Sequence, residues 1–294
     1  MMKYWLVSAV NKGGGIINIK IENQSILYRG RHQYEKVLRV NAAGFSIEPA
    51  KVAIGGKVEE FCREGSNRKW TRMICKGITT SLLMMPILKR EELEENTKEI
   101  LSSLKDAPID YILVPSIHSK EFTPRVVRDL KKQNYPVLEV YFTSLEECKY
   151  VPWDWIKQAV GPSSLSFVFR FPPPDSKIDL ENKLKWEEAL SEHFNVVTFE
   201  SGAVLSKNEM QITGVYPRKG TIARGDADYL LYYDNERTVT EKDSEASSIW
   251  GQEPEIVVLR GEILKAGQQI YPTKGFGRCC NDLFPGRLRS INGV

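Results

Sequence analysis

Between residues 78 and 199 the chain alternates short apolar runs with amphipathic or charged stretches, and this alternation constrains the fold more than any other feature. The apolar runs have the length of buried strands, and they are ITTSLLMM (78–85), IDYILVPS (109–116), PVLEVYFTS (136–144), SLSFVFRF (164–171) and NVVTF (195–199). Strands that alternate with helices predict βα units, which form a mainly parallel sheet with right-handed crossovers.

The stretches between the apolar runs carry helix signals. Residues 58–77 are amphipathic and predict one helix, with Gly77 as its stop. A second helix is expected from Pro124, because Thr123 is a good capping residue and proline is favoured at the first helical position.

Both ends of the chain have β character instead. The first 50 residues contain alternating apolar positions such as Ile17, Ile19 and Ile21, separated by turns, which predicts a half-buried antiparallel sheet. The last 80 residues return to short strands, and a charged loop over 235–255 interrupts them. We therefore expect the two ends to fold together.

Composition limits the classes of function. The 294 residues fit one large or two modest domains, and 41 basic residues nearly balance 38 acidic ones, so nucleic-acid binding is not expected. No stretch reaches the roughly 18 apolar residues of a membrane span. Five cysteines without framework spacing, and no evident signal peptide, predict a cytoplasmic protein with reduced thiols.

Several segments, in a consistent order, resemble one enzyme family. GVYPRKGTIARGDADYLLYYD (214–234) resembles the segment after the barrel in the dihydropyrimidinase and hydantoinase group of amidohydrolases. Similar matches are VNAAGFSIEP (40–49), KGITTSLLMMP (76–86) and IVVLRGEILKAGQQIYPTKGFGR (256–278). Without the resemblance, a structural role explains these residues equally well: Gly220 and Gly225 allow turns, and Asp228 forms a hydrogen bond with a loop backbone.

The resemblance implies an incomplete TIM-barrel-derived α/β domain over 51–212, and a discontinuous β-sandwich over 1–50 and 213–294. A full (β/α)₈ barrel typically needs about 250 residues. The middle segment is much shorter, so we expect the last βα units of such a barrel to be missing. The open edges of a partial barrel need a cover. This predicts a homo-oligomer or an amidohydrolase-type partner.

The resemblance also implies where a metal centre would lie. These enzymes hold divalent ions with a His-x-His on the first barrel strand and a carboxylated lysine on a later one. Aligning Pro49 with the family's proline puts Ala53 at an aspartate position and Gly55 and Lys57 at the two histidines, while Glu139 takes the place of the lysine. Alanine and glycine cannot ligate a metal ion, and a protonated lysine repels one. We therefore expect no divalent metal cofactor.

Three functions stay open. The first is a non-hydrolytic homologue with a binding, assembly or regulatory role. The second is a hydrolase of carbon–nitrogen bonds with a remodelled site, for which His118, Glu121, Glu139 and Arg170 are the candidate catalytic residues near strand ends. The third is a sensor that binds a small molecule in the vestigial pocket. The other histidines, His32 and His193, match no ligand position of the family.

Overall fold

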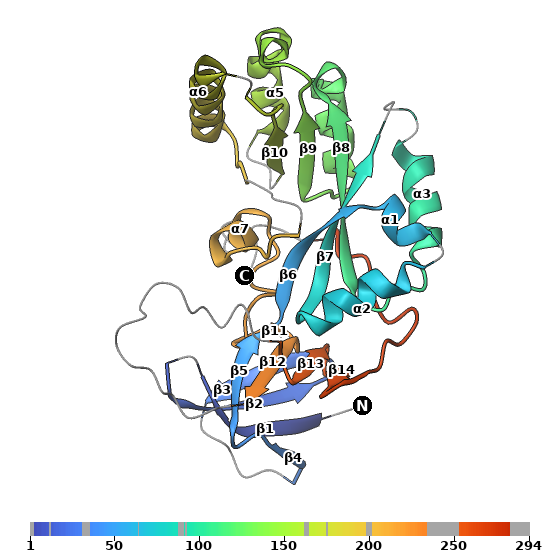
Figure 1. Ribbon diagram of the computed structural model, residues 1–294, viewed down its shortest axis with the longest axis vertical. Helices are drawn as coiled ribbons and strands as arrows, with labels where there is room; N and C mark the ends of the chain where they lie inside the picture. The colour runs from blue at the N-terminus through green and yellow to red at the C-terminus, as the bar shows by residue number, and fades with distance from the viewer. Residues whose placement is uncertain are drawn as a thin grey trace.

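The computed structural model describes residues 3–11, 13–30, 36–63, 65–87, 91, 93–161, 165–174, 176–197, 202–233 and 253–282. Most of the predicted charged loop, and His32, lie outside these residues. The described chain forms two sheets, a parallel one in the upper part of Figure 1 and a mainly antiparallel one below it.

The parallel sheet confirms the alternation of strands and helices. It has the order β10-β9-β8-β7-β6 and curls like part of a barrel (Figure 1). Its strands are β6 (Lys51–Lys57), β7 (Ile78–Pro86), β8 (Asp110–His118), β9 (Val137–Tyr141) and β10 (Ser166–Arg170). Neighbouring strands in the sheet are also neighbours in sequence, as βα units require.

Helices follow the strands. They are α1 (Glu59–Cys62), α2 (Asn67–Cys75), α3 (Leu93–Ser103), α4 (Pro124–Lys132), α5 (Trp153–Val160), α6 (Lys177–His193) and α7 (Lys207–Ile212), with 3₁₀ turns η2 (Ser119–Glu121) and η3 (Leu145–Tyr150). The predicted start of α4 is confirmed, because the Thr123 hydroxyl accepts a hydrogen bond from Val126 N at 3.4 Å.

The single helix predicted over 58–77 is wrong. The chain forms α1 and α2, which are separated around Gly65, whose φ is +89°. The first helix ends at Cys62, because the next residue, Arg63, is extended, with φ −84° and ψ 156°. The break lets the rings of Phe61 and Trp70 pack against each other, with centroids 4.6 Å apart. Core packing therefore outweighs a continuous helical pattern here.

The antiparallel sheet contains strands from both ends of the chain. The N-terminal strands are β1 (Lys3–Val10), β2 (Ile16–Glu22), β3 (Ser25–Gly30), β4 (Leu38–Asn41) and β5 (Phe45–Pro49). The C-terminal strands are β11 (Gly225–Asp226), β12 (Tyr229–Tyr233), β13 (Ile256–Leu259), β14 (Glu262–Ala266) and β15 (Gln269–Ile270). Strand β5 joins the two groups, because it pairs with β1 and with β12. The domain boundaries given above stay a prediction.

The two faces of the parallel sheet bury different clusters. Side chains of the outer face pack against α1–α5. The inner face packs against α7, and its cluster includes Val52, Leu82, Ile112, Val137 and Val168 together with Met210. Because side chains alternate along a strand, every second residue after these also points to the inner side.

One edge of the parallel sheet is covered by the segment after α6. Phe167 N on β10 donates a hydrogen bond to Asn195 O at 2.7 Å, and Val197 N donates to Phe167 O at 2.9 Å. Val196 thus forms a parallel bridge with Phe167. This is the described part of the strand predicted over 195–199.

The next described residues cover the opposite edge. Ile54 N on β6 donates to Ala203 O at 2.9 Å, and Leu205 N donates to Val52 O at 2.8 Å. Both edges of the partial barrel therefore bond to the protein's own chain at these positions. A partner was expected to cover the open edges, and these segments of the same chain cover part of them. Association with a second copy or an amidohydrolase-type partner stays a prediction.

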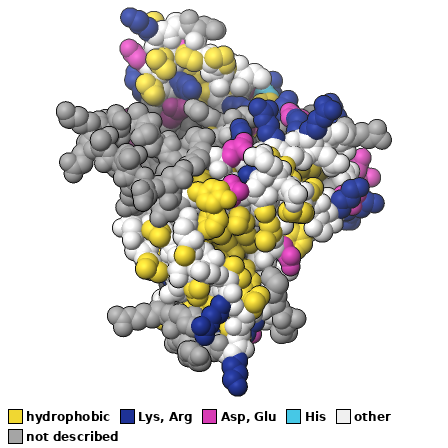
Figure 2. Space-filling view, turned by 60° about the horizontal axis from the view of Figure 1, so that its bottom comes forward, with side chains coloured by type: hydrophobic (Ala, Val, Ile, Leu, Met, Phe, Trp, Pro, Cys, Tyr) yellow, Lys and Arg dark blue, Asp and Glu magenta, His cyan; other side chains and the backbone are white. Residues whose placement is uncertain are grey.

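The surface carries apolar and charged areas side by side. Figure 2 shows hydrophobic side chains gathered near the middle of one face, with Lys and Arg side chains mainly toward its margins.

Among the described residues, none of the helices has the length and apolar character needed to cross a membrane.

Candidate functional site

The carboxyl ends of β8, β9 and β10 bring polar side chains together on the inner face. Ser116 lies opposite Glu139, and Tyr141 lies between His118 and Arg170 in the strand register. These positions are two or four residues beyond inner-face core residues, so they share that face. Three of the four predicted candidates are thus on adjacent strands.

Glu139 is a buried carboxylate with two polar neighbours. Its side chain is 5% exposed, and its Oε1 lies 2.5 Å from Nη2 of Arg170, whose side chain is 53% exposed. Ser116 Oγ donates a hydrogen bond to Glu139 Oε2 at 2.5 Å. A buried carboxylate is costly unless it is paired, so Arg170 and Ser116 stabilise the charge of Glu139.

His118 is engaged at both ring nitrogens. Its Nδ1 accepts a hydrogen bond from Lys120 N at 3.1 Å, which caps the short η2 turn. Its Nε2 lies 3.6 Å from Glu147 Oε1. Since Nδ1 accepts from a backbone N–H, the proton of the neutral ring is on Nε2. In this arrangement His118 has no nitrogen available as a general base.

Glu147 belongs to the same cluster, although its sequence position predicts only a surface acid on a helix. Its carboxylate accepts hydrogen bonds from Ser119 Oγ at 2.6 Å, Thr143 Oγ1 at 2.6 Å and Thr143 N at 3.0 Å. Burial raises the pKa of Glu147, but these hydrogen bonds and His118 outweigh burial and lower the pKa to about 2. No spacing in the sequence signals this convergence.

A shallow hollow opens beside the cluster. It has a volume of about 290 Å³ and is lined by Ile87, His118, Lys120, Glu121 and Tyr141. Glu121 is exposed on its rim, and the rings of His118 and Tyr141 meet edge to face, with centroids 5.1 Å apart. The fourth predicted candidate, Glu121, therefore lines the same hollow as His118.

The positions aligned with the family's first-strand ligands lie on β6. Ala53 is buried in the outer-face cluster, and Lys57 is exposed at the end of the strand. A side chain at Gly55 would start 2.2 Å from Ser81 Oγ and 2.6 Å from Leu83 Cδ2. Position 55 thus has no space for an imidazole. Alanine and glycine supply no ligand atom and lysine supplies a cation, so these three residues do not fit the first-strand ligands that the resemblance implies.

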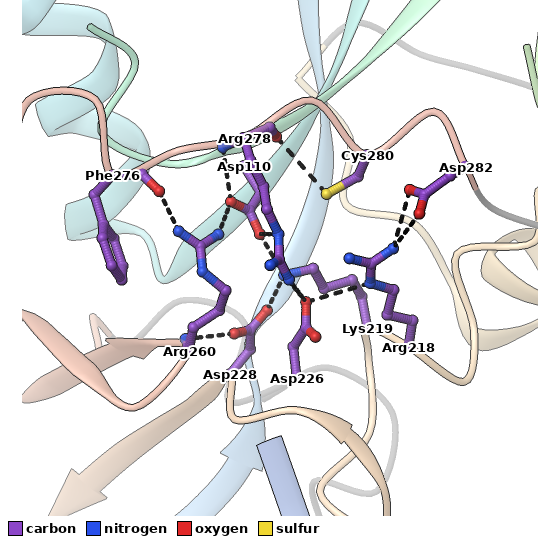
Figure 3. A network of polar contacts seen from close by, with 10 residues as sticks. All are labelled: Asp110, Arg218, Lys219, Asp226, Asp228, Arg260, Phe276, Arg278, Cys280 and Asp282. Carbon is purple, nitrogen blue, oxygen red and sulfur yellow. Dashed lines mark hydrogen bonds and ion pairs between the residues drawn. The ribbon is translucent and has the colours of Figure 1, made fainter. Parts of the chain in front are cut away.

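A second polar cluster lies at the amino end of β8 (Figure 3). Lys219, whose side chain is 1% exposed, places its Nζ 2.6 Å from Asp110 Oδ2, 2.6 Å from Asp228 Oδ2 and 2.8 Å from Asp226 Oδ2. Burial would lower the pKa of Lys219, but the three carboxylates raise it above its usual value. The ammonium therefore stays charged inside the protein.

Backbone and arginine groups complete this cluster. Arg260 donates from its backbone N to Asp228 Oδ1 at 2.7 Å and from its guanidinium to Asp110 Oδ1. Arg278 donates from its backbone N to Asp110 Oδ1 at 3.0 Å and from Nη2 to Asp226 Oδ2 at 2.8 Å. Figure 3 shows these side chains converging from separate segments. The cluster joins β8, β11, the β13–β14 turn and the C-terminal segment.

The motif that carries the family resemblance builds this cluster. Lys219, Asp226 and Asp228 all lie in the segment 214–234. Gly220 and Gly225 allow turns, as the sequence predicts, because their φ angles are positive, +72° and +111°. Asp228 does accept a hydrogen bond from the Arg260 backbone N in the β13–β14 turn, but it also forms an ion pair with Lys219. The motif thus specifies architecture at the end of β8 opposite to Glu139 and Arg170.

Comparison with solved structures gives the fold. The chain shares its fold with hydantoinases. A D-hydantoinase from a Bacillus species superposes with a TM-score of 0.58 at 13% identity, over 96% of this chain and 99% of that one. A dihydropyrimidinase from Brevibacillus agri gives 0.53 at 11% identity, over 97% and 99%. An atrazine chlorohydrolase from Arthrobacter aurescens, solved with zinc, gives 0.52 at 12% identity, over 91% and 96%.

The identities are too low to carry more than the fold. No family model matches the sequence. The α/β class, with a curled parallel sheet beside a mainly antiparallel one, agrees with the expectation of a partial barrel and a sandwich. The resemblance of the sequence to this group therefore extends to the three-dimensional structure.

Proposed function

We propose that the protein is a non-hydrolytic relative of the hydantoinase-type amidohydrolases that binds a small anionic molecule at the carboxyl ends of β8–β10 without a divalent metal. The Glu139–Arg170 ion pair carries this proposal. The resemblance aligns Glu139 with the metal-bridging lysine, and here a guanidinium contacts that residue. A cation of the chain itself thus stabilises the carboxylate.

The chemistry of Arg170 favours an anionic ligand. A guanidinium has five N–H donors in a planar fork that matches a carboxylate or a phosphate. Arg170 is half-exposed, and its ion pair with Glu139 involves Nη2. Glu139 is buried and held by Ser116, so it fixes the guanidinium while the exposed part can contact a ligand. Tyr141, the neighbour of Arg170 in the strand register, adds an aromatic surface.

The same geometry gives little support to hydrolysis. A hydrolase without a metal needs a general base or nucleophile with a free acceptor atom. His118 Nδ1 already accepts a hydrogen bond from Lys120 N, and the two oxygens of Glu139 contact Ser116 and Arg170. We therefore place ligand binding ahead of a remodelled hydrolase of carbon–nitrogen bonds.

Metal analysis and thermal unfolding of the purified protein test the proposal. We expect far less than one zinc or manganese ion per chain, and an unfolding temperature that rises with dicarboxylates such as malonate or succinate. A ligand at 100 times its Kd adds about 2.7 kcal/mol of stability. Arg170→Gln should abolish the response, whereas Lys149→Gln, which removes a lysine–glutamate pair exposed at the surface, should keep it.

Two results would overturn the proposal. One is a zinc or manganese ion bound at one per chain that resists dialysis against a chelator. The other is a thermal response to dicarboxylates that is equal in wild type and Arg170→Gln, because the guanidinium would then not be the anchor.

A further inference from the structure

The hollow beside His118 has an apolar and aromatic lining next to the anion anchor. Ile87, which is 5% exposed, contributes an aliphatic side chain, and His118 and Tyr141 contribute two rings. Tyr141 lies between His118 and Arg170 in the strand register, and the three side chains share the inner face. The guanidinium of Arg170 therefore has an aromatic ring of the hollow as its direct neighbour.

The rings of the hollow are held in place before any ligand binds. His118 Nδ1 accepts a hydrogen bond from Lys120 N, and Nε2 lies 3.6 Å from Glu147 Oε1. Glu147 is itself held by a hydrogen bond from Ser119 Oγ at 2.6 Å. The ring of His118 then meets that of Tyr141 at 90°, an arrangement that aromatic pairs prefer. A preformed wall lowers the cost of ordering side chains on binding.

We propose that the ligand of this site is an aromatic carboxylate, whose acid group binds Arg170 and whose ring lies in the hollow against Tyr141. The inference rests on the proposed function, because Arg170 is the anion anchor in both. Tyr141 is then the residue that selects among anions, and His118 is a positioning residue that holds the Tyr141 ring.

The size and chemistry of the hollow favour a single ring. Its volume is about 290 Å³, and an apolar cavity of about 150 Å³ accommodates benzene. An aromatic ligand ring gains more against an aromatic side chain than burial of its area alone provides. Acetate can reach the guanidinium but is too small to contact the wall of the hollow as well. The exposed rim residues Lys120 and Glu121 have opposite charges, so the rim does not itself favour a second acid group.

The affinities of three monocarboxylates for the full chain test the inference. NMR titration with acetate, cyclohexanecarboxylate and benzoate gives three dissociation constants. Benzoate should bind about tenfold tighter than acetate, because it buries a ring, and about threefold tighter than cyclohexanecarboxylate, because that ring is aromatic. In the wild-type protein, the ring protons of bound benzoate should show nuclear Overhauser contacts to the ring protons of Tyr141.

Variants of Tyr141 separate the effect of the ring from that of the anchor. Tyr141→Phe should keep the preference for benzoate over acetate, whereas Tyr141→Leu should reduce it to less than about threefold. Tyr271→Leu is the matched control, because it removes a half-exposed tyrosine that follows β15, and it should leave the preference unchanged. If Tyr141→Leu does not fold, the Overhauser contacts of the wild type and the affinities of Tyr141→Phe decide.

The inference is overturned if benzoate binds wild type no tighter than acetate, if bound benzoate shows no contact with Tyr141, or if Tyr141→Leu keeps the full preference. The thermal response of wild type to malonate, and its loss in Arg170→Gln, distinguishes this failure from failure of the proposed function. With that response present, only the ring preference is wrong. Without it, the anion anchor is wrong as well.

Discussion

Cationic side chains compensate buried carboxylates at both ends of the parallel sheet. Lys219, together with Arg260 and Arg278, does so for three aspartates at the amino end of β8, and Arg170 does so for Glu139 at the carboxyl ends of β9 and β10. The sequence alone identifies Arg170 as a candidate site residue, because it lies at the end of an apolar strand. Lys219 is visible only as a motif residue, because its partner Asp110 lies 109 positions away. Such pairs depend on the tertiary fold, which local patterns do not specify.

Glu147 gives a prediction about pH at the same scale. Its folded pKa of about 2 lies below the ordinary value of 4.5 for a glutamate, so its contribution to stability is present above about pH 4.5 and is lost as pH falls toward 2. Glu147→Gln should destabilise the protein at pH 7 and flatten the pH dependence between pH 4.5 and 2. Urea unfolding over this pH range measures both effects.

Glu146 provides the matched control, because its exposed side chain pairs with Lys149 only at the surface. Glu146→Gln should change stability by less than about 1 kcal/mol. Equal pH profiles for Glu147→Gln and wild type would contradict the assignment of this titration to Glu147.

At the scale of elements, strands were easier to predict than breaks between helices. The apolar runs that became β7–β10 have strand length and sharp ends, so pattern alone identifies them. Phe61 packs on Trp70 across the break between α1 and α2, and the helical pattern reveals neither the break nor this contact. The pairing of Val196 with β10 and of Val204 with β6 was equally inaccessible, because edge contacts depend on how the sheet curls.

Strand β6 gives a prediction about rebuilding a metal centre. Gly55→His should destabilise the protein by about 3 kcal/mol, because its side chain would overlap Ser81 and Leu83 in a packed layer. Lys57→His, at an exposed position, should be nearly neutral. The double variant should bind no zinc. Chemical denaturation and metal analysis check these expectations, and a stable double variant with one zinc would contradict them.

At the scale of the whole molecule, the two chain ends and the middle segment are interdependent. Asp110 begins β8 in the parallel sheet, yet its partners Lys219, Arg260 and Arg278 all come from the C-terminal part of the chain. Tyr111 N also donates to Arg278 O at 3.0 Å, so the C-terminal segment bonds to β8 directly. The sequence indicates that the two ends fold together, but not that the C-terminal segment also bonds to the parallel sheet.

This interdependence predicts that the segment 51–212 does not fold alone. Without the C-terminal part, Asp110 would be a buried charge with no partner, and such a loss costs about 3–5 kcal/mol. That is a large share of the 5–15 kcal/mol that stabilises a typical domain. The fragment should therefore lack cooperative thermal unfolding and near-ultraviolet circular dichroism.

Asp110→Leu separates the two settings. In the fragment it should recover part of the structure, since it removes the unpaired charge. In the full chain it should destabilise the protein, because Lys219 and Arg260 would each lose one carboxylate. A fragment with native-like cooperative unfolding would mean that the middle segment is an autonomous domain and that the charged cluster only attaches it to the other sheet.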